Sequence, residues 1–171
     1  MVLIEPLSPL ESHVRQQTAT RPTILRFNQY KATSMESVNL NSRVDSIKDH
    51  WQPEQLMTVD SSHTLKIAKI KGSFIWHSHP DTDEVFYCVS GGPMRLEIST
   101  KATSPEHAEQ LGVDHTVELK VGDMFKVPQG VQHRPIADVE TGILMIERVG
   151  TVNTGDREGH ELTAVLKGSE V

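Results

Sequence analysis

Three histidines and one glutamate have the residue types and the spacing of a metal site. His77 and His79 are two residues apart, so on an extended strand both imidazoles point to the same face. Glu84 follows the turn Pro80–Asp83 and begins a returning strand beside them. His133 lies far off in the sequence, and we expect it to reach the others from a strand across a barrel.

This set of side chains points to a transition metal. Imidazole suits iron, copper, nickel and zinc, and a carboxylate oxygen adds tolerance for manganese. Four protein ligands on a six-coordinate ion leave two positions for water, O₂ or substrate. We therefore expect one divalent transition metal ion per chain (iron, manganese, nickel or zinc), bound by His77, His79, Glu84 and His133.

Neighbouring polar residues have plainer interpretations. Asp81 and Asp83 could compete as ligands, but turn aspartates more often bond their own backbone. Cys88 has the same strand parity as Glu84 and could line a cavity, but free cysteine favours a buried core position. The other six histidines show no ligand spacing and are expected to be solvated. They are His13, His50, His63, His107, His115 and His160.

No general acid or base can be identified from the sequence. Charged residues near the predicted strands could hold a substrate carboxylate or transfer a proton, but each is expected to face solvent. They are Arg95, Lys126, Arg134 and Glu147. Trp76 and Phe125 flank the ligand residues and are expected to pack in the core.

Short strands must position these residues. The predicted strands cover residues 64–71, 73–79, 84–89, 94–98, 117–119, 124–127 and 143–146. Turn signals separate them, among them Gly72, Pro128–Gly130 and Thr141–Gly142. Residues 99–116 are interpreted as a loop or short helix, and residues 44–51 as a helical turn. Many short strands without a long helix predict an all-β sandwich or barrel.

Two stretches resemble the motifs of the cupin superfamily. Residues 72–91 contain a glycine, His-X-His, a glutamate and a closing glycine, with one residue fewer than usual before His77. Residues 122–133 contain a glycine, Pro-X-Gly and the last histidine, although Ala137 stands where the family often has asparagine. Residues 147–156 are also similar to the end of small single-domain bacterial cupins.

The resemblance implies an all-β double-stranded β-helix, the RmlC-like jelly-roll barrel of cupins. The barrel would occupy residues 54–150, between an N-terminal arm (1–53) and a polar C-terminal tail (151–171). The four ligand positions of the family are filled, which implies the same metal site. The reaction stays open because the family includes dioxygenases, decarboxylases, isomerases, epimerases and binding proteins. A dioxygenase-type oxidoreductase acting on a small oxygenated or carboxylated metabolite is the first choice. A metal-assisted isomerase, epimerase or decarboxylase and a non-catalytic sugar or metabolite binder are the alternatives.

Composition limits the partners. The chain has 171 residues, 17 basic against 23 acidic, and a net charge of -6, which argues against nucleic acid as a partner. No apolar run approaches the roughly 20 residues of a membrane helix, and the first residues lack a signal-peptide pattern. A single cysteine favours a reducing compartment, so we expect a cytoplasmic protein with a small-molecule ligand. The predicted strand Thr23–Phe27 could cover a sheet edge in a homodimer.

Overall fold

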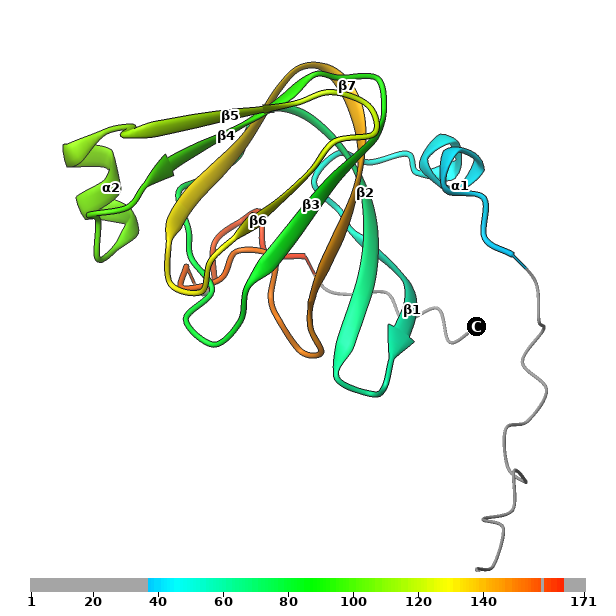
Figure 1. Ribbon diagram of the computed structural model, residues 1–171, viewed down its shortest axis with the longest axis horizontal. Coiled ribbons are helices and arrows are strands. Elements are labelled where there is room, and N and C mark those ends of the chain that lie inside the picture. Colours follow the sequence, from blue (N-terminus) through cyan, green and yellow to red (C-terminus); the bar gives the residue numbers. More distant parts are fainter. Residues whose placement is uncertain (1–36, 158, 165–171) are drawn as a thin grey trace, which may run out of the picture. The chain divides into compact units, whose positions relative to one another are not determined.

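The computed structural model describes residues 37–157 and 159–164, all within one compact unit (Figure 1). The expected strand Thr23–Phe27 and His13 lie outside these residues. The described elements are α1 (Leu40–Ser46), β1 (Glu54–Val59), β2 (His63–Ser73), β3 (Glu84–Ser90), β4 (Met94–Ser99), α2 (Pro105–Leu111), β5 (His115–Leu119), β6 (Met124–Val127) and β7 (Gln132–Arg148). Neither described helix is long and apolar enough to span a membrane.

The central strand of the fold is β7. Its 17 residues pair antiparallel with β2 along most of their length. Its first part, 132–137, also pairs with β4, and a later part, 142–146, pairs with β3. Because β7 exchanges one neighbour for another, the sheet curls around it, with the order β1-β2-β7-β3-β6 on one path and β4-β5 on the other (Figure 1). The all-β jelly roll expected from the sequence is confirmed.

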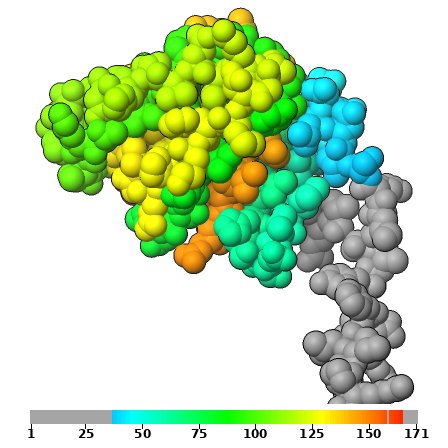
Figure 2. Space-filling model, viewed as in Figure 1, coloured from blue at the N-terminus to red at the C-terminus, as the bar shows by residue number. Residues whose placement is uncertain are grey.

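Strands β2, β3 and β7 are buried on both faces. Inside the barrel, Ala68, Phe86 and Met145 belong to one core cluster. On the outer face, a second cluster joins residues of the strands to Val44, which lies in α1, and to Ile47, which directly follows the helix. The second cluster consists of Val44, Ile47, Leu56, Ile67, Val89 and Leu144. Helix α1 therefore covers a sheet face that would otherwise meet water. In the space-filling view the atoms of α1, in blue, lie directly against those of the strands (Figure 2).

Several predicted boundaries were wrong. The first helix is α1 at 40–46 rather than 44–51. Strand β2 continues through Gly72, which takes a φ of 79° at a bulge instead of ending the strand. Thr141–Gly142 is not a turn but lies within β7, where α1 approaches so closely that a Cβ on Gly142 would be 2.6 Å from a methyl carbon of Val44. That glycine makes room for a helix rather than for a turn.

The polar segment that follows β4 contains helix α2. Ser104 caps it by accepting a hydrogen bond from the backbone N–H of His107 at 3.2 Å. Ala108 of α2 packs with Ala102 against Trp76, which is 1% exposed. The core position expected for Trp76 is confirmed, and α2 covers the end of the sheet formed by β4 and β5 (Figure 1).

Candidate metal centre

Two of the predicted ligands lie on directly adjacent backbone segments. His77 and His133 form an antiparallel bridge, with N–H···O distances of 3.1 and 2.9 Å between their backbones. The prediction that His133 comes from across the barrel was therefore wrong. Residues 73–79 were expected as one strand, but β2 ends at Ser73. The residues after it form this isolated bridge and one backbone hydrogen bond to β7, from Phe74 N–H to the carbonyl oxygen of Pro135. The pairing with β7 nevertheless fixes the two imidazoles side by side, with ring centroids 4.3 Å apart.

Backbone carbonyls orient two of the rings. Nδ1 of His77 lies 3.0 Å from the carbonyl oxygen of Ile75, and Nδ1 of His133 lies 2.9 Å from that of Val131. An imidazole N–H must donate each of these bonds, which leaves Nε2 as the atom directed at the site. The same contact to the carbonyl two residues earlier thus aims both histidines.

The four predicted side chains come together. One donor atom from each of His77, His79, Glu84 and His133 lies within 4.8 Å of the others, and all four residues are buried. Oε2 of Glu84 is 3.0 Å from Nε2 of His133 and 3.1 Å from Nε2 of His79. Glu84 reaches this position as the first residue of β3, which follows the turn after His79.

Burial and mutual contact shift the pKa values in the cluster. Burial and the neighbouring His133 hold the pKa of His77 well below its usual range, which keeps this imidazole neutral. Burial opposes ionisation of Glu84, but the close approach of the His133 and His79 imidazoles prevails and lowers its pKa. Burial also disfavours the charged form of His79, yet the Glu84 carboxylate raises its pKa. Neutral imidazole and ionised carboxylate are the forms that bind metal.

The donor atoms suit a cation. Nδ1–H of His133 donates to a carbonyl, so its Nε2 and the Glu84 carboxylate oxygen 3.0 Å away need a proton or a metal ion between them. Nε2 of His79 is buried and has no hydrogen-bond partner among the described residues, because its contact with Glu84 is close but poorly directed. A divalent transition metal fits three imidazoles and one carboxylate and would satisfy these atoms together.

A polar network supports the ligands from behind. The Asp156 carboxylate accepts hydrogen bonds from the backbone N–H of Ser78 at 2.8 Å and from its hydroxyl at 2.9 Å. It also accepts one from the amide of Gln132 at 2.6 Å. Ser78 lies between two ligand histidines, and Gln132 precedes the third. One carboxylate after β7 therefore holds both ligand segments.

Gly155 allows this network to form. Its neighbour Asp156 donates a backbone hydrogen bond to the carbonyl of Ser78 at 3.0 Å. A Cβ on Gly155 would lie 2.1 Å from that same carbonyl oxygen and 3.2 Å from Nδ1 of His79. Only glycine lets the chain after β7 approach the ligand loop so closely.

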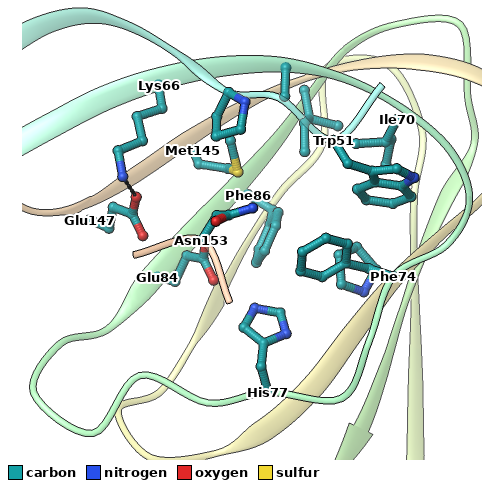
Figure 3. Close-up of a pocket in the computed structure, with 14 residues that line it drawn as sticks. Trp51, Lys66, Ile70, Phe74, His77, Glu84, Phe86, Met145, Glu147 and Asn153 are labelled. Carbon is teal, nitrogen blue, oxygen red and sulfur yellow. Dashed lines mark ion pairs between the residues drawn. The ribbon is translucent and has the colours of Figure 1, made fainter. Parts of the chain in front are cut away.

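The cluster opens on a cavity inside the barrel. His77 and Glu84 line it together with the rings of Trp51, Phe74 and Phe86 (Figure 3). The cavity has an empty volume of about 420 Å³, part of which is open to solvent. Most of the residues that line it are apolar.

Comparison with known proteins identifies the family. The profile of the cupin domain family matches residues 65–147. A cupin-2 domain protein from Shewanella frigidimarina NCIMB 400 is 32% identical; the match covers 65% of this chain and 93% of that chain, with a TM-score of 0.52. The chain belongs to the cupin superfamily.

Two further proteins that this chain resembles differ in how much they share with it. The uncharacterized protein YdbB of Bacillus subtilis (strain 168) is 29% identical over 109 residues, which is 64% of this chain and 83% of YdbB. Hydroquinone 1,2-dioxygenase from Sphingomonas sp. TTNP3, solved with 4-hydroxybenzoate bound, is 14% identical with a TM-score of 0.52; the match covers 66% of this chain and 74% of the dioxygenase. The latter likeness concerns the fold alone.

Asp83 is not part of the cluster, as expected, but it does not bond the backbone of its own turn. Its carboxylate pairs with Lys126 at 2.7 Å and accepts the backbone N–H of Gln129. Other residues lie where the sequence predicted. Cys88 is fully buried in the inner core. Among the remaining histidines, the five that the structure describes are exposed or half-buried, as expected.

The sequence did not predict that two charged residues, Glu147 and Lys66, are buried in the cavity wall. Glu147 was expected to face solvent but is 2% exposed. Lys66, which alternates in the sequence with the apolar Leu65 and Ile67 as an outward-facing lysine would, is 1% exposed. The alternation misled because α1 covers the outer face, so Leu65 and Ile67 face the helix and Lys66 faces the interior. Glu147 is two and four residues from the core residues Met145 and Ile143, so it points to the same face of the strand. Its burial could have been predicted from this spacing.

The remaining charged residues do not contact the cluster. Arg95 pairs with Asp138 at 2.6 Å on the surface. Arg134 is half-buried rather than solvent-facing, since it pairs with Glu97 at 2.6 Å and stacks over the ring of Trp76 at 4.9 Å. These residues support the outside of the sheet and are not candidates for chemistry in the cavity.

Proposed function

We propose that this cupin binds one divalent transition metal ion through His77, His79, Glu84 and His133 and is a metal-dependent enzyme. Its substrate would be a small oxygenated metabolite, and a dioxygenase-type oxidoreductase is the reaction we favour. One observation carries the proposal: four buried ligand atoms converge, and two of their residues, His77 and Glu84, line a mostly apolar cavity.

The chain supplies position and exclusion of water. A bound metal ion would provide open coordination positions at which substrate oxygen, and with iron also O₂, is activated. The rings of Trp51, Phe74 and Phe86 would hold a flat apolar body beside those positions. Burial of the ligand residues keeps bulk water from the reacting atoms.

The aromatic lining of the cavity favours a phenol-like substrate. The rings of Trp51, Phe74 and Phe86 offer surfaces on which an aromatic ring can stack. The dioxygenase that shares this fold binds 4-hydroxybenzoate, a small phenolic acid. A ligand of that kind is what we propose for this chain.

Two alternatives have different support. An isomerase or decarboxylase would need the same metal and a group that transfers protons, and the buried carboxylate of Glu147 on the cavity wall suits that role. A sugar-binding barrel would need hydrogen-bonding groups along its wall, whereas this wall is mostly apolar. The second alternative is therefore disfavoured.

Oxygen consumption tests the proposed reaction. Iron-loaded protein should consume O₂ only when a suitable phenolic, thiol or diketone compound is added, and zinc-loaded protein should not. A His133→Ala variant provides the matched control, because it lacks one ligand. Absence of O₂ uptake by the iron-loaded form with every compound would contradict the oxidoreductase and favour chemistry without oxygen.

We also propose a cytoplasmic homodimer. The outer strand β1 exposes Met57 and Val59, at 41% and 45%, along a sheet edge. A second copy covering this edge would remove both side chains from water. Light scattering after gel filtration should give twice the 19.1 kDa chain mass, and a Met57→Lys substitution should shift the protein towards the monomer.

A further inference from the structure

The cavity wall contains a second polar group besides the metal ligands. Lys66 and Glu147 form an ion pair that is almost completely buried, and the Lys66 ammonium also donates to the carbonyl oxygen of Thr151 at 2.7 Å. Both residues line the same cavity as Glu84 and His77 (Figure 3). The pair therefore faces whatever occupies the cavity.

The ion pair uses only one of the two carboxylate oxygens. Oε1 of Glu147 contacts Lys66, whereas Oε2 is buried and has no hydrogen-bond partner among the described residues. A buried carboxylate oxygen without a donor is costly, because it has lost water and gained nothing in exchange. Among the described residues, Oε2 of Glu147 therefore has no donor, and any partner for this atom must donate a hydrogen bond to it.

The cavity has two chemically different sides. Lys66, Glu147 and Glu84 lie along one side, and Trp51, Ile70 and Phe74 lie along the other (Figure 3). A molecule that fills the cavity would place its apolar face on the rings and its polar edge towards the two carboxylates. His77, the other metal-cluster residue on this wall, lies next to Phe74, with ring centroids 5.3 Å apart, so the metal cluster borders both sides.

We propose that Oε2 of Glu147 accepts a hydrogen bond from a hydroxyl group of the substrate. The cavity would then select flat, apolar molecules that carry one oxygen towards the metal ligands and a second, protonated oxygen towards Glu147. Glu147 is in this sense a specificity-determining residue. The inference rests on the proposed function, because it assumes that the substrate lies in the cavity beside His77 and Glu84.

The charges around Glu147 determine the pH at which its carboxylate is ionised and can accept a hydrogen bond. Burial and the negative charge of Glu84 raise the pKa of Glu147 to about 7, while Lys66 and His79 act in the opposite direction. A metal ion among the ligands would counter the charge of Glu84. Zinc-loaded protein at pH 8.5 therefore has Glu147 ionised and able to accept, and zinc prevents turnover with oxygen.

The test compares how tightly the protein binds ligands with a free hydroxyl group and ligands in which that group is methylated. Dissociation constants of catechol, resorcinol and hydroquinone, and of their monomethyl ethers, are measured by calorimetry on zinc-loaded wild-type protein and on Glu147→Gln. In the variant, Lys66 would bond to the amide oxygen and the amide N–H₂ would face the cavity. The preference of the wild type for at least one diphenol over its ether should fall by ~10-fold or more. Contacts between the ligand and the metal are the same in both proteins and cancel from this ratio.

Two controls guard against misinterpretation. Glu118→Gln makes the same change on exposed β5 and should leave every ratio unchanged. If Glu147→Gln fails to fold, the double variant Lys66→Met/Glu147→Leu removes the pair without leaving a buried charge, and it should also lose the preference for hydroxyl.

Two results would overturn the inference: hydroxyl-to-methoxyl ratios that are equal in wild type and variant, or no diphenol binding by the wild type. Either is distinguishable from failure of the proposed function, which is judged by metal content and by O₂ uptake of the iron-loaded form.

Discussion

The two ends of β7 carry the two polar centres of the cavity, and they are built differently. At the start of the strand, His133 joins three other ligand residues whose donor atoms converge within 4.8 Å. Near its end, Glu147 is paired with Lys66. Both centres are buried, and among the residues that the structure describes each has one side-chain atom without a hydrogen-bond partner, Nε2 of His79 at the first and Oε2 of Glu147 at the second.

The difference lies in what each centre requires from outside. The ligand cluster is rich in electron-pair donors and needs a cation, whereas the ion pair already contains its cation and needs only a hydrogen-bond donor. The first centre is also supported from behind by Asp156, which holds the backbone between two of its histidines. Changes at the first should therefore affect metal, and changes at the second should affect protonation and ligand choice.

Removal of a ligand should have the largest effect. His133→Ala takes away one of four donors, and we expect metal affinity to fall by at least ~100-fold, beyond what changes outside the ligand set cost. Titration with zinc against a competing chelator measures it. Glu147→Gln should retain metal in the same assay, and an equal loss in both variants would remove the distinction between the two centres.

Protonation of Glu147 should make the free energy of unfolding of the metal-free protein depend on pH. Its pKa is raised from 4.5 to about 7 by burial and by Glu84, so its contribution to stability is complete below pH 4.5 and is lost as the pH rises through 7. The loss should be on the order of 3 kcal/mol. Lowering of the Glu84 pKa acts in a separate window, because its contribution is lost as the pH falls below 4.5.

Urea unfolding of the metal-free protein at a series of pH values measures this effect. Histidines also titrate between pH 4.5 and 7, so the wild-type curve is compared with that of Glu147→Gln. The difference between the two curves should show the fall attributed to Glu147. Parallel curves across this window would mean that Glu147 does not titrate there.

Loosening the support of the ligands should have a smaller effect. Asp156→Asn keeps the size of the side chain but removes the charge that accepts from Ser78 and Gln132, and we expect metal affinity to fall ~10- to 100-fold. Asp138→Asn, the same change at an exposed pair with Arg95, is the control. Equal affinity in both variants would show that the network does not position the ligands.

The turn carboxylate should have the smallest effect. Asp83 bonds Lys126 and a backbone N–H rather than the cluster, so Asp83→Asn should leave the metal content at the wild-type value. Elemental analysis of the purified variant decides this. A loss of metal would bring Asp83 back as a candidate ligand.

The sequence predicted the part of the site that local spacing determines. His77, His79 and Glu84 are brought together by a single turn, and His133 follows a second motif, so the four could be grouped without coordinates. The path by which His133 arrives was wrong, because which segments pair in a barrel depends on contacts distant in sequence. The jelly roll itself followed from the strand pattern and from the resemblance to cupins.

The other polar groups depended on packing that the sequence does not display. Lys66 appeared outward because Leu65 and Ile67 supplied an apolar face, but that face packs against α1. Asp156 appeared to lie in a polar tail, and its role emerges only where the chain returns to Ser78. Local alternation distinguishes two faces of a strand, but it does not say which of them is covered from outside.

Metal content of protein purified without added metal tests the central claim most directly. Mass spectrometry for all transition metals, on the wild type and on the His77→Ala and His133→Ala variants, gives the stoichiometry and the element together. The ligand geometry predicts close to one divalent metal ion per wild-type chain and a large loss in both variants. Sub-stoichiometric metal in the wild type that refolding with iron, manganese, nickel or zinc does not restore would contradict the account.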